Sequence, residues 1–197
     1  MPNSTGLALL IRGLYDADPA RRASAAAEIF QRGRELARAA TQSWLADAQL
    51  AACLVRGRNG LAEVTVGVAV EPDTFERIRT ASGMPRLADV PPDQDAQEFE
   101  LEFSNGARLD VLTTRQPGGP GAIARYLQKF GEGIQQVEIA ASDVDRATGI
   151  LRARFGLEPV YPATRAGADG TRVNFFLVPA PDNKKILIEI VEPSVKS

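Results

Sequence analysis

The sequence contains no histidine, and Cys53 is the one cysteine among its 197 residues. Without histidine there can be no Ser-His-Asp or Cys-His catalysis, and no metal site that depends on imidazole ligands. A single cysteine excludes an internal disulfide and is typical of a reducing cytoplasm, and Cys53 lies in an apolar run that predicts a buried thiol. Any acid–base chemistry must therefore depend on carboxylates, lysine, tyrosine or bound water.

Charge and hydropathy exclude further classes of protein. The net charge is −2, and basic and acidic residues are mixed along the chain, so no basic surface for nucleic acid or for a membrane is expected. The apolar runs are far shorter than the ~20 residues that cross a bilayer. Residues 1–5 lack the basic start and the cleavage site of a signal peptide. We therefore expect a cytoplasmic protein that has neither nucleic acid nor a membrane as its partner.

Residues 1–58 are predicted to form a helical N-terminal region, because apolar side chains recur there at helical spacing. Asp18 is expected to cap a helix that begins at Pro19, and a third helical segment carries Trp44 and Leu54. The region is either one helix pair of a HEAT-type repeat or a small helical cap or dimerisation element. A single repeat has no neighbours to stack on, so we favour the second alternative. Residues 56–60 are predicted to be a linker.

Residues 59–197 are predicted to form one domain of two modules, 59–130 and 131–197, in which the same order of elements occurs twice. In the first module, a short helix is expected around Phe75, and strands are expected at 61–70, 97–103 and 108–112. The alternating glutamates of the second of these strands most simply form a solvated sheet face.

The second module is expected to contain a helix at 144–155, which Asp143 caps and Gly156 ends. Strands are predicted at 134–140, 172–178 and 185–191, the last two joined by a turn at 181–184. A further helix at 122–130 leads into this module. Strands that pair in hairpins, with helices on one face, make the predicted fold class α+β.

Three polar side chains of the second module, Gln136, Glu138 and Glu189, are expected to point into one cleft. Glu138 follows Gln136 by two residues, so both project from the same side of their strand. Carboxylates that crowd together bind a proton more readily, which suits a general base working near neutral pH. The alternative is that these side chains only make the cleft polar and catalyse no reaction.

Several segments of the chain together resemble the vicinal oxygen chelate superfamily, which includes glyoxalase I, extradiol dioxygenases and bleomycin-resistance proteins. These segments are 131–137, the helix after Asp143, the loop 167–170 and the strand 187–192. The likeness is greatest to methylmalonyl-CoA epimerases, and the helix 122–130 belongs to it. It extends over about residues 61–192, in detail in the second module and in outline in the first.

The resemblance implies paired βαβββ modules that form a curved mixed sheet around a cleft, with metal ligands on the first and last strand of each module. The corresponding positions are Gln136 and Glu189 in the second module, and Asp110 with Thr65 in the first, or Glu63 if the strand is shifted. The family has histidines at both first-strand positions, and this chain has neither. The general base of the family's first module corresponds to a position near Asp93.

Loss of both histidines changes the expected chemistry. Asp110, Gln136 and Glu189 would offer only oxygen ligands, which suit a hard divalent ion such as magnesium or manganese. The alternative is that they form the polar floor of a metal-free pocket, and we favour no cofactor. The residues expected to contact the ligand are Thr65, Asp110, Gln136, Asn174 and Phe176.

The expected function is the binding of a small molecule in the sheet cleft, without a histidine-ligated metal, as in bleomycin-resistance proteins. The alternative is an acyl-CoA epimerase- or isomerase-like enzyme, in which Glu189 with Glu138 or Asp93 moves a proton beside a thioester carbonyl. An interaction module whose N-terminal helices recruit a partner is a third hypothesis. The sequence does not decide whether the protein is an enzyme, which would be isomerase- or lyase-like. A homodimer is also compatible with the sequence, and exposed Trp44 or Phe30 would contribute to it.

Overall fold

The structure is a computed structural model that describes residues 4–57, 60, 62–181 and 184–194. The predicted start of a strand at Leu61, part of the predicted linker at 56–60 and the centre of the predicted turn at 181–184 lie outside the described residues. The chain divides into two compact units, formed by residues 1–33 with 65–135 and by residues 34–64 with 136–197. The predicted domain boundaries after residues 58 and 130 stay predictions.

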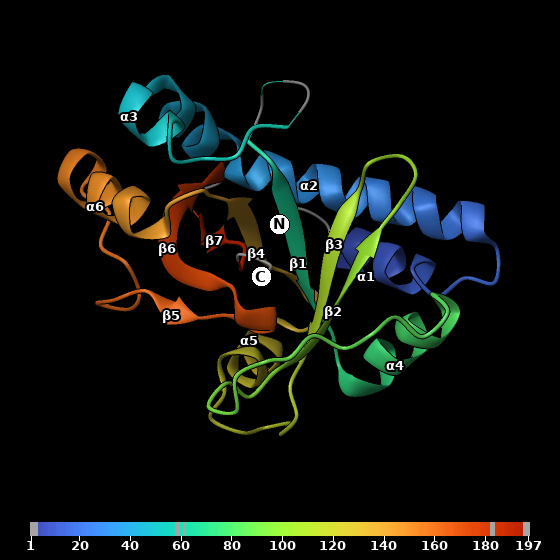
Figure 1. The fold of residues 1–197 in the computed structure, drawn as a ribbon. Helices are drawn as coiled ribbons and strands as arrows, with labels where there is room; N and C mark the ends of the chain where they lie inside the picture. Colours follow the sequence, from blue (N-terminus) through green and yellow to red (C-terminus); the bar gives the residue numbers. More distant parts are fainter. Residues whose placement is uncertain (1–3, 58–59, 61, 182–183, 195–197) are drawn as a thin grey trace. The chain divides into compact units, whose positions relative to one another are not determined.

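Unit 1 contains a three-stranded sheet covered by helices on one face. Its strands are β1 (Val64–Ala69), β2 (Gln97–Glu102) and β3 (Arg108–Thr113), in the order β2-β3-β1. β3 is antiparallel to β2 and parallel to β1. The helices of unit 1 are α1 (Ser4–Gly13), the first part of α2 (Pro19–Ala46), α4 (Pro72–Ala81) and α5 (Ala122–Phe130). Figure 1 shows these elements in blue, green and yellow.

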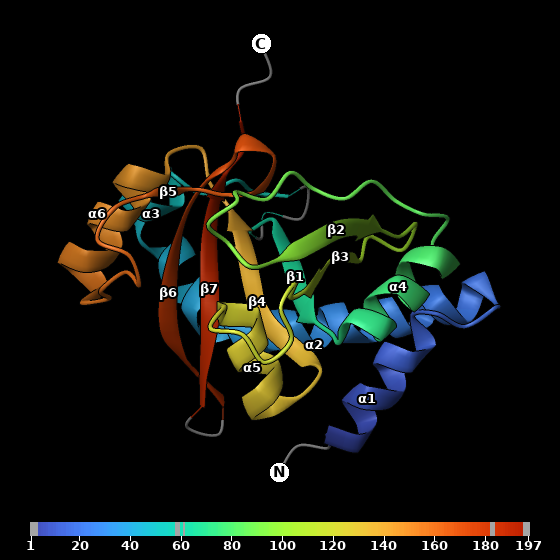
Figure 2. The same cartoon turned by 90° about the horizontal axis from the view of Figure 1, so that it is seen from below.

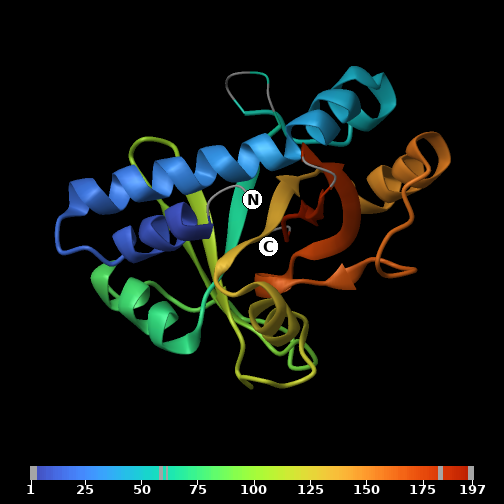
Figure 3. The ribbon, with the colours of Figure 1, turned by 180° about the vertical axis from the view of Figure 1, so that it is seen from behind.

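The core of unit 1 lies between the sheet and three of its helices. Val66, Val68 and Phe99 project from one face of the sheet toward Ile11 of α1, Ile29 of α2 and Ile78 of α4, and Leu14, just after α1, belongs to the same core. The rings of Phe75 and Phe99 meet edge to face with centroids 4.7 Å apart. α1 and the first half of α2 lie side by side (Figure 3), so the N-terminal helices pack on the sheet of unit 1.

Unit 2 contains a four-stranded sheet in the order β4-β7-β6-β5. These strands are β4 (Gly133–Ala140), β5 (Arg165–Ala166), β6 (Arg172–Ala180) and β7 (Lys184–Glu192). β4 is parallel to β7, and the β7–β6 and β6–β5 pairs are antiparallel. Figure 2 shows β4, β7 and β6 running side by side. The helices of unit 2 are the end of α2, α3 (Ala48–Ala51) and α6 (Val144–Phe155), with a 3₁₀ turn, η1, at Ala168–Gly170.

The two units repeat one topology, which confirms the predicted α+β class with mixed sheets. In each unit the first strand is parallel to the last strand, and the last strand forms an antiparallel hairpin with the strand before it. The second module has four strands, but the first has three, because the loop 82–96 contains no counterpart of β5. The N–H of Ala88 there donates to the carbonyl oxygen of Glu98 at 2.9 Å, which pairs part of the β2 edge.

The ends of α6 follow the sequence prediction. The Asp143 carboxylate accepts a hydrogen bond from the N–H of Arg146, and Gly156 adopts the left-handed conformation that ends the helix, with φ 63°. The carboxylate of Glu192 accepts from the N–H of Val144 at 2.8 Å, so the end of β7 also caps this helix.

Two predictions for the N-terminal region were wrong, and both concern α2. α2 is longer than predicted and buries the residue that was expected to be exposed. The helix continues through Trp44 to Ala46, and the third predicted segment is only the four-residue α3, capped by Asp47. Trp44 is 1% exposed, because the second half of α2 belongs to unit 2 and turns this side chain inward. Phe30 packs against the core of unit 1. The homodimer stays a prediction, but the buried side chain of Trp44 does not offer a contact for it. None of the helices in the described part of the chain is long and apolar enough to cross a membrane.

Gly33 of α2 lies close to Val66 of β1, and we predict that Gly33→Ala destabilises the protein. A Cβ atom at Gly33 would lie 2.5 and 2.6 Å from the two methyl carbons of Val66. The better helix propensity of alanine would offset only ~1 kcal/mol of the 1–3 kcal/mol that overpacking costs. The free energy of unfolding, measured in urea, should therefore fall by about 1 kcal/mol.

Gly149→Ala is the matched control, since Gly149 lies inside α6 with nothing within 4 Å of its added Cβ. That variant should be more stable than the wild type by roughly 0.5–1 kcal/mol. Equal effects of the two substitutions would contradict the close packing of α2 on β1.

Tyr126 holds α5 against the start of β4, and we predict that this contact weakens at high pH. Its hydroxyl donates to the carbonyl oxygen of Ile134 at 2.8 Å, and burial raises the pKa of Tyr126 to about 12. The raised pKa in the folded state means that the stabilisation is complete below pH ~10 and is lost as the pH rises toward the folded value. Tyr126→Phe should cost ~1 kcal/mol at pH 7, in urea unfolding, and this difference should shrink above pH 10. A difference that is constant with pH would show that the phenol does not make this contact.

Candidate functional site

The register of the unit 2 sheet gathers polar side chains on one face. Glu189 of β7 lies opposite Glu138 of β4 and opposite Phe175 of β6, so these three side chains project from the same face. Gln136 projects there as well, because it precedes Glu138 by two residues. The other face carries Ile188 and Ile190, which are fully buried. We call the first face the polar face of unit 2.

Gln136 connects the two glutamates of the polar face. Its amide nitrogen, Nε2, donates to Oε2 of Glu189 at 2.6 Å and is 3.3 Å from Oε1 of Glu138. Gln136 is 6% exposed and Glu189 is 8% exposed, so the shorter contact is shielded from water. Hydrogen bonds to a carboxylate are roughly twice as strong as those between neutral groups. The amide therefore fixes the position of the Glu189 carboxylate.

This arrangement does not fit the metal ion that the superfamily resemblance implies. A metal ligand must offer a lone pair, but Gln136 turns its N–H donors toward both carboxylates and lies where a cation would bind them. Among the described residues, no three or more His, Cys, Asp or Glu side chains form a group that could hold a metal ion. Asp110, the third member of the predicted metal set, belongs to unit 1.

Asn174 and Phe176, which were predicted to contact a ligand, lie on the opposite face of the unit 2 sheet. Phe176 lies opposite Ile188 and is fully buried, and Asn174 lies opposite Ile190. The side-chain oxygen of Asn174 accepts a hydrogen bond from the N–H of Phe175 at 2.9 Å, and its Nδ2 finds no hydrogen-bond partner in the described part of the chain. The structure does not bring these two residues together with Gln136 and Glu189.

Phe175, and not the predicted Phe176, lies beside Glu189 on the polar face. It is half-buried, and Tyr161 meets it edge to face, with ring centroids 5.9 Å apart. The guanidinium carbon of Arg165 lies 4.4 Å from the centre of the Tyr161 ring. These three residues, which we call the aromatic–arginine stack, were missed by the sequence analysis. Tyr161 lies in an irregular loop and Arg165 in a two-residue strand, where no periodic pattern predicts contacts.

The predicted residues of the first module lie in unit 1. Thr65 and Asp110 are buried and share the sheet face opposite the helices, because Asp110 pairs with Gly67 and Thr65 precedes Gly67 by two residues. Thr65 lies within β1, and Glu63, its alternative, lies just before that strand. Asp93 is exposed in a turn of the loop 82–96. The binding and catalytic roles of these residues stay predictions.

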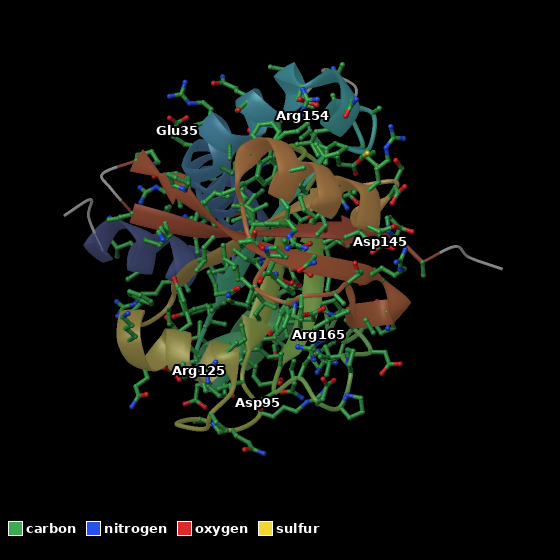
Figure 4. The ribbon with its side chains drawn as sticks, turned by 90° about the vertical axis from the view of Figure 1, so that its left-hand side faces the viewer. Glu35, Asp95, Arg125, Asp145, Arg154 and Arg165 are labelled. Carbon is green, nitrogen blue, oxygen red and sulfur yellow. The ribbon has the colours of Figure 1, made fainter. Side chains whose placement is uncertain are left out.

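Asp95 has a structural role that the sequence analysis did not identify. Its carboxylate accepts a hydrogen bond from the Thr114 hydroxyl at 2.6 Å and another from the N–H of Arg115 at 3.1 Å. It therefore fixes the segment that leads from β3 to α5, and Figure 4 shows its position. Cys53 is also structural. It is 1% exposed, and burial raises the pKa of its thiol, as expected for an unreactive cysteine.

The chain matches no family model and no curated protein, but it is similar to solved structures of methylmalonyl-CoA epimerases. The enzyme from Mycobacterium tuberculosis is 29% identical over 66% of this chain and 87% of its own, with a TM-score of 0.55. A Streptomyces coelicolor variant, bound to 2-nitronate-propionyl-CoA, is 25% identical over 68% of this chain and 95% of its own, with a TM-score of 0.53. These enzymes have the vicinal oxygen chelate fold that the sequence predicted, and the predicted fold is therefore confirmed.

We predict that Gln136→His gives the protein an affinity for divalent metal ions that the wild type lacks. The substitution removes the amide donors and places an imidazole, a favoured ligand of zinc and manganese, beside Glu138 and Glu189. Metal at a hundredfold excess over its dissociation constant should stabilise the folded variant by ~2.7 kcal/mol, seen as a rise in melting temperature that EDTA reverses. Gln135→His is the control, because the neighbouring side chain projects from the other face. An equal metal-dependent rise in the wild type would show that the native residues already hold a cation.

Proposed function

We propose that this protein binds an acyl thioester, such as an acyl-CoA, and moves a proton at the carbon beside the thioester carbonyl. The solved structures that it is similar to include methylmalonyl-CoA epimerases, and the two described above are 29% and 25% identical to it. The observation that carries the proposal is the buried Glu189 carboxylate, which the Gln136 amide holds in place at 2.6 Å. A carboxylate fixed in this way is the type of general base that such a reaction needs.

Glu189 can take the proton although it accepts a hydrogen bond from Gln136. A carboxylate offers about four lone-pair positions, and the amide uses one of them. In the proposed step the C–H bond breaks, its proton goes to Glu189, and its electron pair moves to the thioester carbonyl oxygen to form an enolate. The reverse transfer returns a proton to carbon. Solvent deuterium enters the product if the proton on Glu189 exchanges before it returns.

Gln136 has a second role in this mechanism. Protonation of Glu189 removes the negative charge that makes its hydrogen bond with the amide strong. The N–H then becomes available to donate to the enolate oxygen at the moment when charge develops there. Loss of one donor of this kind typically costs 10²–10³ in rate.

Inversion at the carbon requires a second group on the opposite side of the planar enolate. Glu138 is poorly suited to this role, because the same amide nitrogen approaches both glutamates and they lie on one sheet face. It is better suited to pass the proton between Glu189 and solvent. We propose that proton exchange depends on Glu189 and that epimerisation depends on a second acid as well.

A second candidate function is the binding of a small molecule without turnover. The bridge from Gln136 to two carboxylates is complete without a cation, and a half-buried aromatic residue, Phe175, lies beside it. Such a face can recognise a ligand through shape and apolar contact alone. Measurement of binding and of proton exchange on the same ligands separates the two candidates.

We predict that the wild-type protein incorporates deuterium from D₂O at the α-carbon of acyl-CoA thioesters, and that EDTA does not stop it. NMR or mass spectrometry of the recovered thioester measures the exchange. Glu189→Gln keeps the size of the side chain but removes the base, so the rate should fall at least 100-fold, within the range known for general bases. Glu158→Gln is the control, because Glu158 forms a surface ion pair with Arg152.

The outcomes distinguish the two functions. Thioesters that raise the melting temperature of the wild type but gain no deuterium would support binding without turnover. If no acyl-CoA either binds or exchanges, both candidates are wrong for this ligand class.

A further inference from the structure

Arg165 lies on the same sheet face as the proposed base. In the β5–β6 pair, Arg165 is opposite Val173, and Val173 precedes Phe175 by two residues on one strand. The polar face therefore runs from Gln136 and Glu138 through Glu189 and Phe175 to Arg165. Arg172, in contrast, projects from the other face and forms ion pairs with Asp145 and Glu192. Figure 4 labels Arg165 and Asp145.

The aromatic–arginine stack fixes the guanidinium at the end of this face. The guanidinium carbon of Arg165 lies 4.4 Å from the Tyr161 centroid, and the Tyr161 ring is fixed in turn by Phe175. A cation over an aromatic ring is attracted to its electron-rich face, and a stacked guanidinium loses less freedom when it binds a ligand. Its five N–H donors form a fork that matches the two oxygens of a carboxylate or phosphate, and a contact made by one donor leaves others for a ligand.

Charge therefore changes sign along the polar face. Two carboxylates lie at the β4–β7 end, a guanidinium lies at the β5 end, and the aromatic rings of Phe175 and Tyr161 lie between them. An anionic group of a ligand would be repelled at the first end and bound at the second. This polarity would orient a ligand so that its neutral C–H acid lies over Glu189 and its anionic group lies at Arg165.

We propose that Arg165, held on Tyr161, is the anion-binding residue of this site and selects ligands that carry a carboxylate or phosphate. The position of the reacting carbon rests on the function proposed above, but the recognition of the anion does not. Tyr161 acts as a positioning residue, because its ring holds the guanidinium.

The test is isothermal titration calorimetry with wild type, Arg165→Gln, Arg165→Lys and the control Arg152→Gln, which removes a surface arginine of α6 paired with Glu158. The probes are malonyl-CoA, acetyl-CoA, CoA, malonate and inorganic phosphate. We expect Arg165→Gln to weaken malonyl-CoA binding by about tenfold or more, as for loss of one good ion pair. Arg165→Lys should recover part of the loss, since lysine keeps the charge but not the fork. Arg152→Gln should bind like the wild type.

The probes identify the source of the anion. A loss confined to malonyl-CoA and malonate places a carboxylate of the acyl group at Arg165, whereas an equal loss for acetyl-CoA and CoA places a phosphate of the CoA there. Both results support the proposal. Binding of malonate or phosphate that depends on Arg165, with no binding of any thioester, would support anion recognition and contradict the acyl-CoA function.

Two results would overturn the proposal. One is an affinity of Arg165→Gln within twofold of the wild type for every probe that binds. The other is a wild type that binds none of the five probes. Tyr161→Phe and Tyr161→Ala test the positioning role. The phenylalanine variant should keep the preference for malonyl-CoA over acetyl-CoA, and the alanine variant should lose part of it at an unchanged urea midpoint.

Discussion

The parallel ladder between β4 and β7 is the constraint on which the candidate site depends. Its register pairs Glu138 with Glu189, and the β6–β7 register then places Phe175 beside Glu189. A slip of one residue would turn Ile188 and Ile190 out of the core and bury the glutamates in their place. The burial of these isoleucines on the other face therefore fixes the polar face, so the same packing determines the stability of the fold and the geometry of the site.

The elements of the fold could be predicted from the sequence, but the composition of the polar face could not. Local chemistry determines features such as the Asp143 cap, the Gly156 end of α6 and the alternation in β2. β6 is different, because Phe175 and Phe176 are both apolar and alternation cannot assign their faces. That assignment depends on pairing with β7, which is remote in sequence. Asp95 and Tyr161 likewise act through partners that no local pattern identifies, and the length of α2 was set by packing that buries Trp44.

A neutral amide between two carboxylates has different consequences from a cation in the same place. A divalent ion neutralises the carboxylates and binds substrate oxygens directly. The Gln136 amide supplies hydrogen bonds to Glu138 and Glu189 without neutralising their charge. With the Gln136 amide in the position of a metal-binding side chain, the site is better suited to proton transfer or to binding alone than to Lewis-acid chemistry.

A site without a cation must orient its ligand by other means. Binding energy from a group remote from the reacting carbon can supply that orientation, and it raises the rate when it holds the C–H bond against the base. Arg165 lies at the far end of the face from Glu189, and Tyr161 limits its motion. An anion held there would draw the ligand across Phe175, whereas the same anion at Glu138 would be repelled. The proposed separation of a positive end from a negative end along one sheet face thus favours the orientation in which the anionic part of a ligand lies at Arg165 and its neutral part reaches Glu189.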